Sequence, residues 1–263
     1  MKFTRKESWF GYALILLSII SLPINTILME VFKPSNDNWE HVKQTVLQDY
    51  IINSLILTLG VSFGSLLLGI PTAWLTAVCN FPFKRTIVLL LILPMAMPAY
   101  IIAYTYTGIF DFAGPVQYNI RKFMGWSYND YFFPEVRSIG GAIIMFSLVL
   151  YPYVYLLARA TFLNQSANVI EISRLLNTGP WKSFFKVAFP LARPAIIVGL
   201  SLVLMETLAD YGTVSYFGVT VFTTGIFKTW FGLGDYSTAA KMAAILLIFV
   251  FVLIIAERYS RKR

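Results

Sequence analysis

The sequence predicts an all-α polytopic membrane protein, a bundle of six transmembrane helices with a cytoplasmic helix-turn-helix between spans four and five. Three observations predict this class. Hydrophobic residues make up 57% of the 263 residues and charged residues only 13%, whereas soluble domains average roughly 45–50% and about 25%. Six apolar stretches are each long enough to cross a hydrocarbon core of about 30 Å. These stretches are continuous apolar runs, unlike the alternating strands of a transmembrane barrel.

The six predicted spans are residues 9–29, 50–78, 86–110, 139–158, 194–211 and 238–256. The first apolar run is too long for the apolar region of a cleavable signal peptide, and no small-x-small cleavage site follows it. We therefore expect it to remain as a membrane span.

Lysine and arginine residues indicate the orientation of the bundle. With the N-terminus inside, fourteen of the 21 basic residues fall on the cytoplasmic side: the first six residues, residues 84–85, the loop 159–193 and the tail 258–263. The positive-inside rule then predicts that both termini are cytoplasmic.

The composition excludes several classes of function. With one cysteine and one histidine, Cys79 and His41, the chain lacks the ligands of a Cys/His zinc site and cannot form an internal disulfide. A histidine-based catalytic relay would need His41, which lies in a polar loop far from any helical nucleophile. The net charge of +8 is dispersed between apolar runs, so a nucleic-acid surface is not indicated. We expect no catalytic residues, no metal site and no nucleic-acid partner.

Small and hydroxylated residues form a stripe along span two. They recur every three or four positions, which places them on one helix face: Ser54, Thr58, Ser62, Ser65 and Gly69. Such a stripe allows neighbouring helices to approach closely. Because the path of a transported solute would be built from such polar positions, Ser54, Thr58 and Ser62 are also candidates for lining it.

Prolines and acidic residues mark two further spans. Pro94 and Pro98 lie one turn apart in span three and predict a kink. Glu206 and Asp210 lie one turn apart on span five, in its outer part. A carboxylate within a membrane is costly. Glu206 and Asp210 either line an outer vestibule, where they attract a cation or a basic patch on another protein, or form a structural hydrogen bond with a tyrosine or threonine of another helix.

The loop between spans four and five carries the strongest pattern. Asn168 followed by Glu171 predicts the start of a short helix over residues 169–176, and the run 177–180 (Asn-Thr-Gly-Pro) predicts its end. A second helix would then end at Pro190. Helical spacing places three aromatic residues and an alanine on one of its faces: Trp181, Phe184, Phe185 and Ala188. This helix-turn-helix either lies on the lipid surface or docks on a partner, because both uses require the same amphipathic character.

The same loop resembles the EAA loop of binding-protein-dependent ABC importer permeases. That loop has Glu-Ala-Ala, three residues, Gly, nine residues and then Ile-x-Leu-Pro. This chain has the corresponding residues at the same spacing: Glu171, Ile172, Ser173, Arg174, Leu175, Leu176, Asn177, then Val187, Ala188, Phe189 and Pro190. Ile172, Ser173 and Asn177 depart from the pattern, although Asn replaces Gly well at a left-handed helix end. The resemblance implies an ATPase-coupling loop formed by Glu171, Arg174, Leu175, Asn177, Gly179, Phe184, Phe185 and Pro190.

A second resemblance is to the ferric-iron branch of these permeases. It covers the chain from about residue 50 onward and is carried by the runs 204–214, 216–218, 222–226 and 230–235. Members of that branch are usually two six-helix halves in one polypeptide, and this chain resembles the N-terminal half. We therefore divide it into an N-terminal span with its periplasmic loop (1–49), a type I ABC importer transmembrane domain (50–257) and a basic cytoplasmic tail (258–263).

The resemblance implies a permease subunit that moves ferric iron across the bacterial inner membrane. Its implied partners are ABC ATPase subunits, a periplasmic binding protein that docks on the external segments 111–137 and 212–236, a second permease half (fused, separate or identical) and the lipid bilayer. No G-x-x-x-x-G-K-[ST] phosphate loop is present, so ATP and magnesium belong on the partner, and this chain binds no cofactor. The alternatives are thiamine or an aminophosphonate as the substrate, or a self-sufficient secondary carrier.

Overall fold

The computed structural model describes residues 4–127, 130–175 and 179–261, and every regular element in these ranges is helical. The first half of the chain forms α1 (Thr4–Val31), α2 (Asp37–Thr45), α3 (Leu47–Val78), α4 (Lys84–Ile92), the 3-10 helix η1 (Leu93–Ala96), α5 (Ala99–Phe110) and α6 (Pro115–Met124). The second half forms α7 (Ile139–Leu175), α8 (Pro180–Ser183), the π-helix η2 (Phe184–Ala188), α9 (Phe189–Ala209), α10 (Gly212–Tyr216), α11 (Phe222–Phe227), the π-helix η3 (Lys228–Gly232) and α12 (Tyr236–Arg261).

The polytopic helical bundle predicted from the sequence is confirmed. Among the described residues, five helices are long and apolar enough to cross a membrane: Trp9–Val31, Leu47–Val78, Ile139–Gln165, Trp181–Ala209 and Tyr236–Tyr259. A sixth span exists if the broken pair Lys84–Ala96 and Ala99–Met124 is one crossing.

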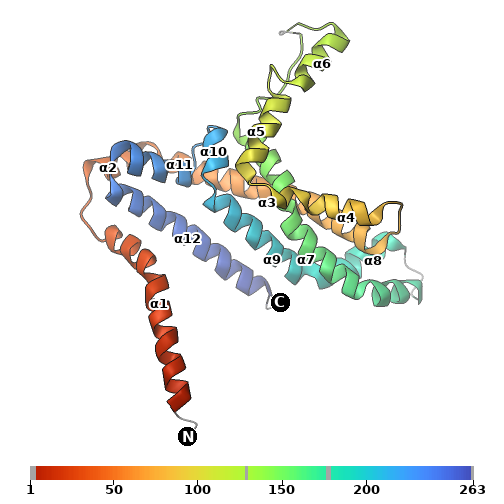
Figure 1. Ribbon diagram of the computed structural model, residues 1–263, viewed down its shortest axis with the longest axis horizontal. Helices are drawn as coiled ribbons and strands as arrows, with labels where there is room; N and C mark the ends of the chain where they lie inside the picture. Colours follow the sequence, from red (N-terminus) through yellow and green to blue (C-terminus); the bar gives the residue numbers. More distant parts are fainter. Residues whose placement is uncertain (1–3, 128–129, 176–178, 262–263) are drawn as a thin grey trace.

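Predicted span three is broken where the sequence places its two prolines. Pro94 lies within η1 and Pro98 precedes α5, and the chain turns by 103° between the two parts. The kink predicted within residues 86–110 is present, but it separates two helices and is much sharper than a bend within one helix. Two prolines four residues apart remove two amide donors, and their rings clash with the preceding turns, so the helix cannot continue through them. Because of this turn, α5 and α6 project away from the bundle (Figure 1).

The helix that contains predicted span four is longer than the span predicted from the sequence. The helix α7 runs without interruption from Ile139 to Leu175, so a separate helix beginning near Asn168 does not exist. No glycine or proline occurs between Arg159 and Leu175. Without either, capping residues alone do not stop a helix whose backbone hydrogen bonds can continue.

The core is formed by α3, α7 and α9, and each of these helices packs against the other two. Glycines on α3 and α9 allow a close approach to α7: a Cβ at Gly69 of α3 would lie 2.9 Å from the Val154 side chain, and one at Gly199 of α9 would lie 2.8 Å from the Val154 Cα. Gly60 and Gly64 of α3 face α7 in the same way. Gly69, the last residue of the predicted stripe, therefore serves close helix packing, and so do Gly60 and Gly64 on a neighbouring face.

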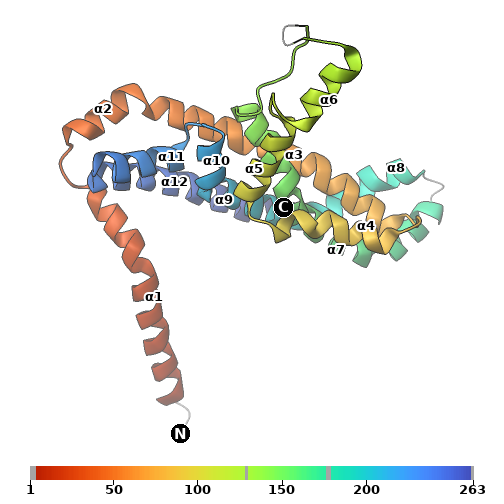
Figure 2. The same cartoon turned by 45° about the horizontal axis from the view of Figure 1, so that its top comes forward.

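The first helix lies apart from this core. Only 6% of its apolar window is buried, and it meets the bundle mainly through α12. Both views show α1 running away from the other helices (Figures 1 and 2). One end of α3 lies next to α2, and the start of α4 and α8 lie near its other end (Figure 1). Lys84 at the start of α4 and Lys182 in α8, both predicted to be cytoplasmic, therefore lie at the same end of the bundle.

Candidate functional site

The candidate coupling region is the segment that leads from α7 through α8 and η2 into α9. Glu171, Arg174 and Leu175 belong to the last turns of α7, although their side chains lie outside the described part of the structure. Asn177 lies outside the described residues altogether. Gly179 is exposed and its carbonyl oxygen accepts a hydrogen bond from the amide of Ser183 at 3.1 Å, which closes the first turn of α8.

Phe184 fixes this segment to the bundle. Its side chain is 7% exposed, and its ring centroid lies 5.1 Å from that of Trp74 on α3 and 6.2 Å from that of Phe162 on α7. Phe189 of α9 and Phe185 pack against it at 5.9 Å and 4.9 Å. Aromatic pairs at such distances add about 0.5–1.5 kcal/mol each to the burial of their area. Phe184 therefore connects the segment after α8 to two helices of the core.

The predicted common face of the second helix is split. Phe184 and Ala188 are buried, whereas Trp181 is 73% exposed and Phe185 62% exposed. The two exposed rings stack on each other with centroids 6.5 Å apart. The prediction placed all four residues on one face because it assumed α-helical spacing, but η2 winds with the wider π spacing and rotates them relative to one another.

Pro190 does not end the element, contrary to the prediction. The π-helix η2 leads directly into α9, and Pro190 occupies its first turn. A π-turn absorbs the proline within a continuous span, as such insertions do in other helices.

The two carboxylates of span five have different surroundings. Glu206 is exposed on α9, and its Oε1 accepts a hydrogen bond from the Tyr153 hydroxyl of α7 at 3.3 Å. Asp210 follows α9, and its Oδ1 accepts from the amides of Thr213 (2.8 Å) and Val214 (3.2 Å) in the first turn of α10. Asp210 Oδ2 accepts from the Thr213 hydroxyl at 3.0 Å. Asp210 is thus engaged in a local turn, while Glu206 keeps an exposed carboxylate with one interhelical partner.

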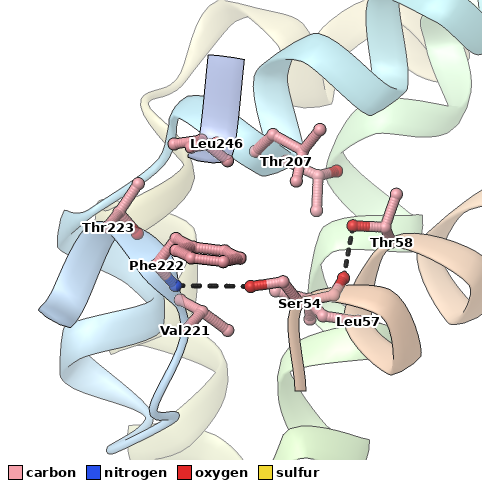
Figure 3. A pocket seen from close by; sticks show the side chains of 9 residues that line it. Ser54, Leu57, Thr58, Thr207, Val221, Phe222, Thr223 and Leu246 are labelled. Atoms are coloured by element: carbon pink, nitrogen blue, oxygen red, sulfur yellow. Dashed lines mark hydrogen bonds between the residues drawn. The ribbon is translucent and has the colours of Figure 1, made fainter. Parts of the chain in front are cut away.

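Two of the three small residues proposed for the path lie beside a cavity. Ser54 and Thr58 are buried on α3, and Ser62 is half-buried one turn further on. The Thr58 hydroxyl donates to the carbonyl of Ser54 at 2.5 Å, and the Ser62 hydroxyl to the carbonyl of Thr58 at 2.6 Å. Figure 3 shows Ser54 and Thr58 at the cavity, opposite side chains from three other elements. The lining consists of Ser54, Leu57, Thr58, Thr207, Leu208, Val221, Phe222, Thr223 and Leu246.

Residues 212–232, which comprise α10, α11 and η3 and are called here the outer segment, fold back onto the bundle. The side-chain amide of Asn53 donates to the carbonyl and the hydroxyl oxygen of Thr220, each at 2.9 Å. The next residue, Ser54, accepts the amide of Phe222 at 3.3 Å. Gly225 is required here, because a Cβ would lie 2.7 Å from the ring of Tyr50. The expected external surface is therefore partly a packed part of the bundle.

A polar cluster that the sequence analysis missed joins the end of α1 to the start of α12. Lys241 is 5% exposed, and its Nζ donates to the carbonyl oxygens of Lys33 and Pro34, each at 3.1 Å. It also lies 5.8 Å from the centroid of the Trp39 ring. Cations are favourable at the C-terminal end of a helix, where carbonyl groups lack partners. The sequence feature that could have indicated this cluster is a lysine near the start of an apolar span.

Asp235 completes this cluster beside α12. Its carboxylate accepts from the side-chain amides of Asn36 (2.7 Å) and Asn38 (3.0 Å) and from the amide (3.0 Å) and hydroxyl (2.7 Å) of Thr238. Burial raises the pKa of the Asp235 carboxyl, but the donors from Thr238, Asn38 and Asn36 outweigh burial and lower this pKa to about 2. The cluster therefore fixes the outer end of α1, which is otherwise little supported.

The second external segment, residues 111–137, is organised around α6. Gln117 donates to the carbonyl of Phe110 at 2.8 Å and accepts from the Tyr131 hydroxyl at 2.8 Å. Arg121 donates to the same hydroxyl at 2.8 Å. Large apolar side chains remain exposed around this network, among them Phe123 and Phe132 at 88% and 90%. An exposed apolar surface of this kind is typical of a contact with another protein or with lipid.

The described residues contain no group of three or more histidine, cysteine, aspartate or glutamate side chains that could hold a metal ion. The candidate site residues in this part of the chain are therefore hydroxyl side chains, the two separate carboxylates of Glu206 and Asp210, and aromatic rings. Such groups can guide a solute or transmit movement.

Comparison with known proteins identifies the relatives of this chain. The family model described as "Binding-protein-dependent transport system inner membrane component" matches residues 65–263. The Fe(3+)-transport system permease protein FbpB 2 of Haemophilus influenzae is 22% identical over 98% of this chain, which spans 47% of that relative. The molybdenum transport system permease protein ModB of Escherichia coli is 28% identical over 64% of the chain and 69% of its own length. The putative 2-aminoethylphosphonate transport system permease protein PhnU of Salmonella typhimurium is 24% identical over 89% of the chain and 85% of its own length.

Solved structures share the fold. A bacterial alginate ABC transporter, solved with a periplasmic protein that carries an alginate pentasaccharide, superposes with a TM-score of 0.70 at 17% identity, covering 97% of this chain and 94% of that one. The inward-facing MetNI methionine ABC transporter superposes with a TM-score of 0.63 at 17% identity, covering 85% and 98%.

Proposed function

Since the chain belongs to the family of inner membrane components of binding-protein-dependent transport systems, we propose that it forms the membrane pathway of an ATP-driven importer, as a permease subunit of ABC type. The observation that carries this proposal is the segment from the end of α7 to η2. It projects exposed aromatic rings at Trp181 and Phe185, while Phe184 holds it against α3 and α7. A segment that is exposed on one side and tightly packed on the other suits the transmission of movement from a partner to the bundle.

A separate ATPase supplies the energy in this proposal. The sequence has no phosphate-binding loop of the G-x-x-x-x-G-K-[ST] type, so ATP and magnesium bind to the partner. Glu171, Arg174 and Leu175 in the last turns of α7, together with the residues around Asn177 and Gly179, form the contact with that ATPase. A periplasmic binding protein delivers the substrate to the exposed surface around α6 and to the outer segment.

A second permease half completes the pathway. The chain spans about half the length of the iron-transport relative FbpB 2, so the other half is fused, encoded separately or a second copy of this chain. In this proposal the protein lies in the bacterial inner membrane with both termini in the cytoplasm, in agreement with the distribution of its lysines and arginines. Reporter fusions after Lys84 and Lys182 are expected to indicate cytoplasm, and fusions within α6 to indicate periplasm.

We propose ferric iron as the transported substrate. The similarity to FbpB 2 extends over 98% of this chain, and the exposed carboxylate of Glu206 favours a cation over an oxyanion along the path by charge alone. The second candidate is an aminophosphonate, which the similarity to PhnU over 89% of the chain favours.

The experiment that tests both levels is uptake in cells that express the chain with its binding protein, its ATPase and its second half. ATP-dependent accumulation of labelled iron would support the full proposal. Accumulation of an aminophosphonate, and not iron, would overturn the proposal of ferric iron as the substrate but would still support an ATP-driven importer. Uptake that persists without the ATPase would overturn the importer itself and favour a self-sufficient carrier.

A further inference from the structure

The cavity between α3, α9, α11 and α12 is lined by threonine hydroxyls that each already donate a hydrogen bond to a backbone carbonyl (Figure 3). The hydroxyl of Thr58 donates to the carbonyl of Ser54 at 2.5 Å, and the hydroxyl of Thr207 donates to the carbonyl of Val203 at 2.8 Å. The hydroxyl of Thr223 donates to the carbonyl of Asp210 at 2.7 Å. Each of these oxygens can still accept hydrogen bonds. The cavity therefore offers three acceptors from three different elements.

Ser54 supplies the complementary donor. Its side chain is 4% exposed, and its Oγ accepts the amide of Phe222 at 3.3 Å. Among the described residues, the Ser54 hydroxyl accepts this hydrogen bond and donates none. A buried hydroxyl without an acceptor is costly, so this proton requires a partner within the cavity.

The size of the cavity limits what that partner can be. The space open to the centre of a water molecule is about 10 Å³, which is at the lower end of the roughly 10–15 Å³ that one water needs. A sulfate or molybdate ion is several times larger and would need donors, whereas this cavity offers mainly acceptors. Water fits both requirements, because it donates two hydrogen bonds and accepts two.

We propose that this cavity binds one water molecule, which connects α3, α9 and the outer segment. The water donates to the hydroxyl oxygens of Thr58 and Thr207 and accepts a hydrogen bond from the Ser54 hydroxyl. By fixing the Ser54 hydroxyl, it holds the acceptor of the Phe222 amide in place. That amide lies in the first turn of α11 and has no partner within its own helix. The water thus stabilises the attachment of the outer segment to the bundle, whichever substrate is transported.

Threonine-to-valine variants test the site, because valine keeps the shape of threonine and removes one acceptor. We expect Thr58→Val and Thr207→Val each to increase the hydrogen exchange rate of the Phe222 amide by about fivefold to tenfold, measured by mass spectrometry on peptides covering residues 219–227. Since either change releases the same water, the double variant is expected to exchange no faster than the single variants.

Thr107→Val of α5 is the matched control. Thr107 is 1% exposed and donates to the carbonyl of Ala103 at 2.8 Å, like Thr207, but it does not line the cavity. It should leave the exchange of the Phe222 amide unchanged. Equal exchange in Thr58→Val, Thr207→Val and this control would overturn the proposal, as would additive effects in the double variant.

A density map of the whole transporter that resolves ordered waters gives a direct second measurement. A peak within hydrogen-bonding distance of the oxygens of Ser54 and Thr58, absent in the double variant, would support the site. Ordered waters at other buried hydroxyls and none in this cavity would overturn it.

Discussion

The side-chain amide of Asn53 donates to both the carbonyl and the hydroxyl oxygen of Thr220, each at 2.9 Å, although 167 positions separate the two residues. One residue of α3 thus binds both oxygen atoms of Thr220, in the loop that precedes α11. Together with the adjacent contact of Ser54, it fixes the outer segment over one end of the bundle.

Replacement of Asn53 should loosen the outer segment. Asn53→Leu keeps the size of the side chain and removes both hydrogen bonds, each worth about 0.5–1.5 kcal/mol. We expect faster hydrogen exchange over residues 212–227 with little change in α7. Asn25→Leu on α1 is the control, since the exposed side chain of Asn25 donates a hydrogen bond to Ser21 of its own helix at 3.5 Å. Unchanged exchange in Asn53→Leu would show that packing alone holds the segment.

Phe184 and its neighbour Phe185 should differ sharply in their effect on stability. Phe184→Ala removes a ring buried among Trp74, Phe162 and Phe189 and is expected to cost about 3 kcal/mol or more of the free energy of unfolding. Phe185→Ala removes a ring that is 62% exposed, so its cost should stay below about 1 kcal/mol. Thermal unfolding in detergent measures both. A similar loss in the two variants would contradict the assignment of Phe184 as the buried anchor.

Changes at the end of α7 should separate a docking role from a lipid-surface role. Glu171→Ala and Leu175→Asp are expected to leave membrane insertion and abundance near normal while abolishing ATP-dependent uptake, with weaker co-purification of the ATPase. If the segment instead lies on lipid, Leu175→Asp would disturb its membrane attachment and ATPase association would be unchanged. Normal uptake and normal ATPase binding in both variants would remove the support for a coupling role.

Substitutions of Glu206 and Asp210 should have different effects on transport and on stability. Glu206→Gln keeps the hydrogen bond with Tyr153 and removes an exposed charge, so we expect an altered transport rate at unchanged stability. Asp210→Ala removes the acceptor of two amides at the start of α10 and should cost about 1 kcal/mol, the usual value of such a cap. Uptake kinetics and thermal unfolding together separate the two effects. A change of substrate in Glu206→Gln, and not of rate, would indicate a selectivity site.

The contact between α1 and α12 around Asp235 should lose stability in acid. Its pKa is about 2 in the folded protein against an ordinary 3.8. Because the folded pKa is the lower one, the carboxylate stabilises the fold above about pH 4, and this contribution is lost as the pH falls through 3.8 towards 2. We expect the difference in stability between the wild type and Asp235→Asn to be constant above about pH 5 and to shrink towards pH 2. A difference that does not depend on pH would show that the carboxylate charge is not involved.

The sequence by itself determined the class of the protein, the existence and approximate place of its long apolar helices, and a kink at Pro94 and Pro98. These properties depend on runs of neighbouring residues, since about 20 consecutive apolar side chains are enough to specify a span and a proline disrupts a helix wherever it occurs within it. The close packing of the small residues of α3 was also readable, because spacing of three and four residues defines a helix face.

Only the tertiary structure decided the 103° turn after η1, the continuation of α7 to Leu175, the π-turn that carries Pro190 into α9, and the burial of Lys241 against the carbonyls of Lys33 and Pro34. Local patterns state which side chains share a face, but they do not state what that face meets. The partners of Ser54, Asn53 and Lys241 lie 168, 167 and 208 positions away. They come together only when α12 packs against the end of α1 and the outer segment folds back onto α3, and this packing depends on the whole bundle.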